Sequence, residues 1–312
     1  MTVLRIPRSS GKIINGLING VLRSSFAPKL DVEPDLIHKS RRNMDFWGSL
    51  MPLARGIRVR QQVIESVACE LHQPPKTSGE RVVLYFHGGG YCVGSPKSHR
   101  HVVSQLARET GMRVVVPDYR KSLEHPFPAP IEDALAVYHT LLQRGVKPSN
   151  IFFCGDSAGG NLVLSTMLKL KDDGTPLPAA ASCISPWTDL TMSGESILDK
   201  ASLDYLLSHS LLQQFANHYL ATHRHESGPL HHHVSPLYGD LSGLPPLLLQ
   251  VGSHEVLLDD SIRLLEKAIQ SGVNAQLQIW EDMQHVWHYS FALLKDGREA
   301  IEAIAHFFDN YK

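Results

Sequence analysis

Residues 151–164 read IFFCGDSAGGNLVL, and the interpretation of this stretch decides the fold of the 312-residue chain. An apolar run ends in the hexapeptide GDSAGG (155–160), and a second apolar, helix-compatible run follows it. Ser157 is either part of a turn that only reverses the chain or a nucleophile on a sharp strand-to-helix elbow, where its Oγ projects clear of the backbone. Both need small neighbours, because a Cβ beside such a turn would collide with the adjacent strand and helix. The rest of the chain must distinguish the two.

The composition is that of an ordinary globular protein, with 43% hydrophobic and 20% charged residues. The 30 basic and 31 acidic residues give a net charge of −1, so no global field attracts nucleic acid. No apolar run reaches the roughly 18 residues that would span a bilayer, and Lys12, Asn15 and Gly16 interrupt any signal-peptide segment. The 4 cysteines are dispersed without a CxxC pair. We expect reduced thiols and a cytoplasmic protein with no integral membrane association.

The first 50 residues differ from the rest of the chain. Between Met1 and Leu30 every charged residue is basic, and apolar residues recur at helical spacing from Ile13 to Leu22. We interpret residues 1–50 as cap helices on a main domain of residues 51–312, with residues of about 190–225 also contributing to the cap. A membrane-surface helix, a partner-binding helix and a transit peptide are the alternatives for the N-terminal segment.

From residue 57 onward, short apolar runs separate helical patterns. After an early pair of strands the two types alternate, which predicts a mostly parallel, eight-stranded sheet with helices on both faces. The predicted strands are Ile57–Ile64, Val67–His72, Val82–Phe86, Arg113–Pro117, Ile151–Cys154, Ala180–Ile184, Leu247–Val251 and Gln276–Trp280. The predicted helices are Ser98–Glu109, Ile131–Gln143, Gly159–Leu170, Ser202–Tyr219, Asp259–Gln270 and Arg298–Phe308. Chemistry in such sheets lies at the carboxyl ends of the strands, and Ser157 follows one of them.

A glycine run follows the predicted strand VVLYF (82–86) directly, in the order His87-Gly88-Gly89-Gly90. Bare backbone N–H groups there can stabilise the oxyanion of an acyl-transfer intermediate. We expect these donors to be Gly88, Gly89 and Ala158, the last at the positive end of a helix. A flexible loop is the alternative, and a phosphate loop is disfavoured because no GxxxxGK[ST] or GxGxxG pattern follows. The residues expected to line the substrate site are His87, Gly90, Tyr91 and Asp156.

A serine nucleophile needs a base, and the base needs a carboxylate that orients it. In this architecture the chain order is serine, acid, histidine. Glu255 is the first carboxylate after the strand LLLQV, whereas Asp259 opens the next helix and is the alternative acid. His285 follows the last predicted strand at the same edge of the sheet, with His288 as its competitor. The sequence therefore predicts a triad of Ser157, Glu255 and His285.

Residues 231–233 are three consecutive histidines, with His223 and His225 nearby. Such a run suggests a metal site, but adjacent histidines on a loop cannot all face one ion. No acid or cysteine completes a familiar ligand spacing in the sequence. We therefore expect a solvated loop here, with no metal and no cofactor.

Taken together, these motifs resemble the hormone-sensitive-lipase-like carboxylesterases of the α/β-hydrolase superfamily. The likeness runs from about residue 50 to the end. It rests on HGGG (87–90), GDSAGG (155–160), SPWTDL (185–190), VPDYR (116–120), PFPAP (126–130) and His285 after the last strand. The resemblance implies the α/β-hydrolase fold with a helical cap. The family usually carries Asp where this chain has Glu255, whose longer side chain can still accept from the imidazole.

The expected activity is that of a serine carboxylesterase that hydrolyses small-molecule esters through an acyl-enzyme, and the resemblance implies short to medium acyl chains. An amidase or arylformamidase would use the same serine machinery on another leaving group. A non-catalytic binding module is a further alternative, because gibberellin receptors share this fold and serine motif but lack the histidine base. The resemblance leaves open a monomer or a homodimer formed through the edge of the last strand.

Overall fold

The structure is a computed structural model that describes residues 2–11, 16, 20, 34–77, 80–221 and 228–311. Most of the apolar stretch from Ile13 to Leu22, for which the sequence predicts a helix, lies outside the described residues. His223 and His225 also lie outside them. No helix of the described ranges is both long and apolar enough to cross a membrane.

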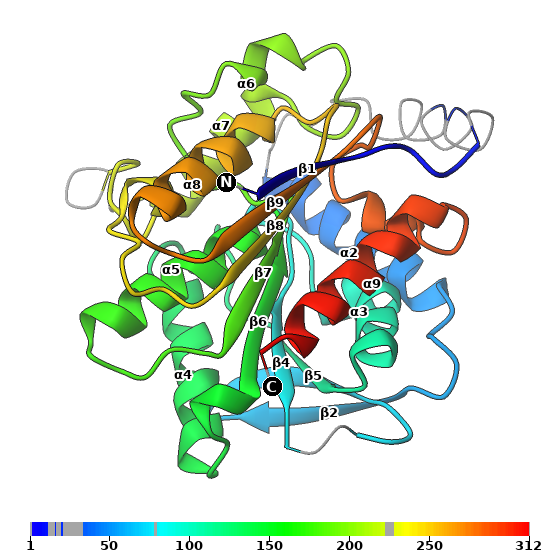
Figure 1. Ribbon diagram of the computed structural model, residues 1–312, viewed down its shortest axis with the longest axis vertical. Helices are drawn as coiled ribbons and strands as arrows, with labels where there is room; N and C mark the ends of the chain where they lie inside the picture. The colour runs from blue at the N-terminus through cyan, green and yellow to red at the C-terminus, as the bar shows by residue number, and fades with distance from the viewer. Residues whose placement is uncertain are drawn as a thin grey trace.

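In the described residues, nine strands form one sheet in the order β1-β9-β8-β7-β6-β4-β5-β3-β2 (Figure 1). Only β3 runs against its two neighbours, and the other pairs are parallel. This agrees with the predicted mostly parallel sheet. The strands are β1 (Thr2–Ile6), β2 (Arg58–Ile64), β3 (Val67–Gln73), β4 (Val82–Phe86), β5 (Arg113–Pro117), β6 (Ile151–Asp156), β7 (Ala180–Ile184), β8 (Leu247–Gly252) and β9 (Ala275–Trp280).

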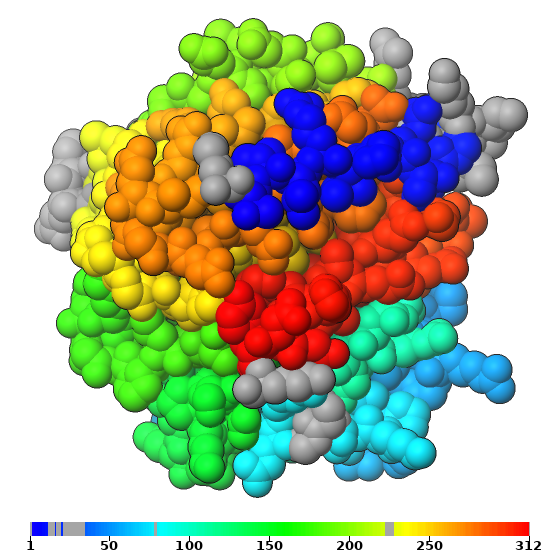
Figure 2. All heavy atoms as spheres, in the orientation of Figure 1, coloured from blue at the N-terminus to red at the C-terminus, as the bar shows by residue number. Residues whose placement is uncertain are grey.

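The ninth strand corrects the prediction of eight strands and of an N-terminal segment made only of cap helices. Residues Thr2–Ile6 pair in parallel with β9, from Thr2 opposite Gln276 to Ile6 opposite Trp280. An ion pair of 2.8 Å between Arg5 and Glu281 fastens the pairing. In Figure 2 these residues lie across the surface beside the orange segment that contains β9. β1 therefore occupies the edge of β9 that would otherwise be free.

Helices cover both faces of the sheet, with α4, α5 and α8 on one side and α3 and α9 on the other (Figure 1). Alternate residues of β4 divide between the two cores, Leu84 and Phe86 facing the first and Val83 and Tyr85 the second. Strands β4 and β6 are therefore buried along their whole length. The helices are α2 (Pro34–Leu50), α3 (Pro96–Thr110), α4 (Ala129–Gln143), α5 (Ala158–Asp172), α6 (Ser196–Asp199), α7 (His209–Leu220), α8 (Leu258–Gln270) and α9 (Lys295–Asp309).

One helix is much shorter than predicted. The pattern over Ser202–Tyr219 predicts a single helix, but α7 begins only at His209. The carboxylate of Asp204 accepts hydrogen bonds from the N–H groups of Leu206 and Leu207, each at 2.9 Å, and so closes a turn. Ser208 then caps α7 through its hydroxyl, which accepts from Leu211 N–H at 3.2 Å. Side-chain capping thus overrides helical periodicity across residues 202–208.

The strand order reverses where the active site is expected. The chain passes from β4 to β5 on one side and then crosses back to β6 on the other side of β4. Ligands in open α/β sheets bind at the carboxyl ends of the strands where the order reverses in this way. The residues at that point are His87, directly after β4, and Ser157, directly after β6.

Candidate active site

Ser157 is the single residue between β6 and α5. Its backbone has φ 55° and ψ −120°, a region that a residue with a Cβ occupies only when its surroundings hold it there. The Ser157 N–H donates to the Ile184 carbonyl at 2.8 Å, and its own carbonyl accepts from Asn161 N–H at 3.1 Å. The backbone at Ser157 is therefore a strained elbow held by β7 and α5, which is the geometry of a nucleophile turn.

The glycines around Ser157 are required by close packing, as the sequence predicts. A Cβ on Gly155 would collide with the Gly159 carbonyl, and a Cβ on Gly159 would collide with the carbonyls of Phe86 and His87. The elbow therefore packs backbone to backbone against the end of β4. This contact brings the GDSAGG hexapeptide beside the HGGG run.

Glu255 and His285 meet in the structure. Glu255 Oε2 lies 2.8 Å from His285 Nδ1, and Glu255 has no exposed surface. The two competitors are engaged elsewhere: Asp259 accepts from Ser196 N–H at 2.8 Å, and His288 Nε2 lies 2.8 Å from the Gln250 side-chain oxygen. The loops after β8 and β9 thus bring together the two residues that the sequence predicts.

The electrostatics of His285 suit a base that a carboxylate orients. Burial alone would lower the pKa of this imidazole, because it disfavours the charged form. The hydrogen bond and the negative charge of Glu255 more than offset burial, so the pKa of His285 is raised above its ordinary value of 6.5. Glu255 therefore favours the imidazolium that forms when His285 accepts a proton.

The geometry of the glycine run corrects one expected oxyanion donor. The Gly88 N–H is already bound, since it donates to Asp156 Oδ1 at 3.0 Å. Among the described residues, the N–H groups of Gly89, Gly90 and Ala158 have no hydrogen-bond acceptor. Gly89 and Gly90 have φ of 115° and 59°, which only glycine adopts at little cost. The free donors at this edge are therefore Gly89, Gly90 and Ala158 rather than Gly88.

Three side chains expected to contact substrate instead hold the glycine run in place. His87 is fully buried and stacks on Tyr119 at a centroid distance of 4.2 Å. Tyr91 is also fully buried, and its hydroxyl donates to Asn161 Oδ1 at 2.7 Å. Asp156 accepts from the Tyr85 hydroxyl at 2.7 Å as well as from Gly88. All three side chains are buried, so they are not placed to contact substrate.

Comparison with known proteins identifies the family. The model of a family with the α/β-hydrolase fold matches residues 83–289. An acetyl-hydrolase of Streptomyces hygroscopicus is 42% identical over 277 residues, which cover 89% of each chain. The chain belongs to the α/β-hydrolase family.

The relatives also specify the branch of this α/β-hydrolase. An esterase of Acinetobacter venetianus is 38% identical over 232 residues, covering 74% of this chain and 76% of its own. A solved esterase of the bacterial hormone-sensitive lipase family superposes with a TM-score of 0.89 at 38% identity, covering 97% of this chain and 99% of the other. The esterase EstE5 superposes with a TM-score of 0.90 at 37% identity and the same coverage. The protein is a carboxylesterase of the hormone-sensitive-lipase-like group.

One residue that contacts Glu255 was not predicted from the sequence. The Ser185 hydroxyl donates to Glu255 Oε1 at 2.7 Å and accepts from Val286 N–H at 3.2 Å. It therefore links the loop that carries Glu255 to the loop that carries His285. Ser185 opens the SPWTDL hexapeptide and follows β7, the strand between β6 and β8, so its position at the catalytic edge could have indicated this contact.

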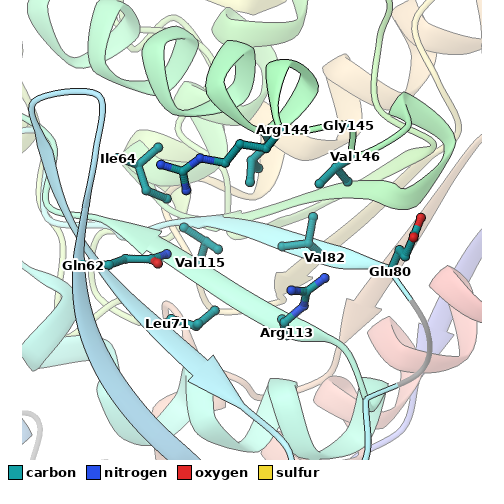
Figure 3. A pocket seen from close by; sticks show the side chains of 11 residues that line it. Gln62, Ile64, Leu71, Glu80, Val82, Arg113, Val115, Arg144, Gly145 and Val146 are labelled. Carbon is teal, nitrogen blue, oxygen red and sulfur yellow. The ribbon is translucent and has the colours of Figure 1, made fainter.

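A pocket of about 300 Å³ lies at the amino ends of β4 and β5, opposite the ends that lead to the candidate active site. It is lined by Val82 and Arg113, the first residues of β4 and β5, and by Arg144 beyond the end of α4. Figure 3 shows the two arginine side chains on opposite sides of it. Because β4 and β5 run parallel, their first residues lie at the edge opposite the one that carries Ser157. This pocket is no part of the candidate active site.

Proposed function

We propose that Ser157, His285 and Glu255 form the catalytic triad of this carboxylesterase. The observation that carries the proposal is the 2.8 Å contact between Glu255 Oε2 and His285 Nδ1, at the sheet edge where Ser157 occupies its elbow. Since Nδ1 faces the carboxylate, the other ring nitrogen, Nε2, is the atom that accepts the serine proton.

The mechanism has two stages. His285 removes the proton from Ser157 Oγ while that oxygen attacks the ester carbonyl, and His285 then protonates the departing alkoxide. Water, activated by the same imidazole, hydrolyses the acyl-enzyme and frees the serine. Glu255 orients the imidazole and stabilises its protonated form. No step calls for a cofactor.

The oxyanion of each tetrahedral intermediate is bound, in this proposal, by the N–H groups of Gly89, Gly90 and Ala158. Fixed donors stabilise developing charge without having to reorganise. The hydrogen bond from Gly88 to Asp156 holds the glycine run in the conformation that leaves the next two N–H groups free. Asp156 therefore acts through Gly88 as a positioning residue.

We also propose that residues of about 190–225 cap the site and limit the acyl chain to short or medium length. Phe215 of α7 lies so close to Gly90 that a Cβ there would collide with its ring. Tyr219 stacks on Tyr91 at a centroid distance of 3.8 Å. The description of one relative as an acetyl-hydrolase, and the soaking of EstE5 crystals with p-nitrophenyl butyrate, support short acyl groups.

The test is hydrolysis of p-nitrophenyl esters from acetate to palmitate by the wild type and by Ser157→Ala, with folding checked by circular dichroism. We expect the highest kcat/KM on acetate or butyrate and a loss on the order of 10⁴-fold or more in the variant. Turnover that survives in a folded Ser157→Ala protein would place the nucleophile elsewhere. A preference for palmitate would overturn only the chain-length proposal.

Location and oligomeric state are further proposals. Cys69, Cys92, Cys154 and Cys183 are all unpaired and buried, which supports a protein of the reducing cytoplasm. If the chain forms a homodimer, the interface must avoid the edge of β9, because β1 occupies it. Light scattering coupled to gel filtration would measure the mass in solution.

A further inference from the structure

A cluster of metal-binding side chains forms at the carboxyl end of α5, outside the active site. Asp172 is the last residue of α5, and His232 and His233 lie on the loop that precedes the short helix η3 (Pro236–Tyr238). The sequence predicts a solvated loop, because no acid near the histidines completes a ligand set. The folded chain instead places an acid beside them, Asp172, from 60 residues upstream.

We propose that Asp172, His232 and His233 bind a divalent transition-metal ion such as Zn²⁺. One carboxylate oxygen, Asp172 Oδ2, lies 3.1 Å from His232 Nε2 and 2.9 Å from His233 Nε2. Two ligands about 2.1 Å from a tetrahedral zinc ion are about 3.4 Å apart. Each imidazole nitrogen would therefore have to move only a few tenths of an ångström from the carboxylate oxygen to bind an ion, and all three atoms lie within 4.8 Å of one another.

The surroundings hold these groups ready. The His233 N–H donates to His231 Nδ1 at 3.2 Å, and the next carbonyl, that of Val234, accepts from the Asn161 side chain at 2.9 Å. The loop is thus fastened to α5 directly after the histidine pair, while His231 is bound to His233 within the loop. Asp172 also lies at the end of a helix, where the dipole favours positive charge. The His233 side chain is only 14% exposed, whereas those of His232 and Asp172 are 40% and 45% exposed, so water can complete the coordination.

The ion would have no direct part in ester hydrolysis. Helix α5 has 15 residues, so its two ends are about 20 Å apart, and Ser157 lies at the other end. A metal at Asp172 would instead join the loop to α5 and stabilise the folded state by its binding free energy. Without metal, both imidazoles can donate hydrogen bonds to the Asp172 carboxylate. Only if the cluster binds metal does the stability of the folded state depend on the ion.

The experiment is isothermal titration of Zn²⁺ into tag-free, chelator-treated full-length protein. We expect one equivalent to bind, with the melting temperature rising by several degrees in excess Zn²⁺. Asp172→Asn and His233→Ala should each weaken binding at least tenfold. Asp172→Asn keeps a hydrogen-bond acceptor for the imidazoles, which protects the fold. The matched control is His306→Ala, which removes an exposed histidine of α9 and should leave binding unchanged.

Cobalt supplies an independent readout. Co²⁺ at a site with two imidazoles should give a visible absorption band that Zn²⁺ displaces, and Asp172→Asn should lose or shift that band. Absence of stoichiometric binding would overturn the proposal. So would binding that Asp172→Asn and His233→Ala leave as tight as in the wild type, because the ion would then be held by other histidines.

Discussion

The two ends of α5 are built in different ways. At its amino end, Ser157 is held by its own hexapeptide and by the ends of the neighbouring strands β4 and β7. At its carboxyl end, Asp172 meets two histidines that are 60 and 61 residues further along the chain. A strained backbone can be recognised from a short run of consecutive residues, because it requires glycine at particular positions. A cluster of side chains from distant segments cannot be recognised in this way, because it depends on how the whole chain folds.

The proposed triad lies between these extremes, since its acid and base are distant in sequence but follow ordered strands. Glu255→Gln should lower kcat by on the order of 10²- to 10⁴-fold, because the amide orients the imidazole less well and no longer stabilises its charged form. Initial rates on p-nitrophenyl butyrate measure this loss. Asp259→Asn is the control and should retain activity, since Asp259 contacts Ser196 rather than His285. Equal losses in both variants would contradict the assignment of Glu255.

The same variant should also change the pH profile. His285 must be neutral to accept the serine proton, so activity falls as pH drops through its pKa. Because that pKa is raised in the wild type, the acid limb of kcat/KM should lie above pH 6.5. Removing the charge of Glu255 should move the limb to lower pH. If the acid limb stays at the same pH in the variant, Glu255 does not set the pKa of the catalytic base.

The packing at the amino end of α5 predicts a large effect on stability. Gly159→Ala should lower the free energy of unfolding by roughly 3 kcal/mol, because the new methyl group meets two backbone carbonyls that cannot move aside. Urea denaturation gives the value. Gly11→Ala is the matched control, since no described atom lies within 4 Å of its added Cβ. Similar stability in the two variants would mean that the contact between the elbow and β4 is looser than described.

A smaller effect is expected at Ser185, which links the loops of Glu255 and His285. Ser185→Ala removes the hydroxyl that donates to Glu255 Oε1, while Gly252 N–H still donates to the same oxygen. We expect kcat to fall about tenfold to a hundredfold with KM unchanged, as loss of a hydrogen bond to a charged group predicts. Ser193→Ala, whose hydroxyl contacts Asp189 instead, should match the wild type. A change in KM alone would argue that Ser185 acts on substrate.

The least effect on catalysis is expected at the carboxyl end of α5. Asp172→Asn should leave kcat and KM within about twofold of the wild type, since surface changes distant from a site seldom alter it. Steady-state rates with and without Zn²⁺ test this independence. A large loss of kcat would mean that the two ends of α5 are coupled and that the cluster at Asp172 is not independent of catalysis.

The features that the sequence predicts correctly are short-range or periodic. The strand VVLYF, the elbow at Ser157 and the meeting of Glu255 with His285 all follow from apolar runs and turn residues. The predictions that were wrong concern which segment a strand pairs with and which groups a side chain binds. β1 is exposed along most of its length and carries no burial signal, so only its register with β9 defines it as a strand. Asp204 ends a periodic pattern because its carboxylate captures nearby N–H groups.

By itself, then, the sequence determined the alternation of strands and helices, the serine elbow and the two strands after which Glu255 and His285 lie. These depend on backbone dihedral angles and on hydrophobic periodicity, which neighbouring residues control. Only the tertiary structure decided that Asp156 accepts a hydrogen bond from the Gly88 N–H and that Ser185 links the loops of Glu255 and His285. It also decided that Asp172 meets His232 and His233. Each of these is a hydrogen bond between distant segments, and its partner is set by where the folded chain places a donor and an acceptor within about 3 Å.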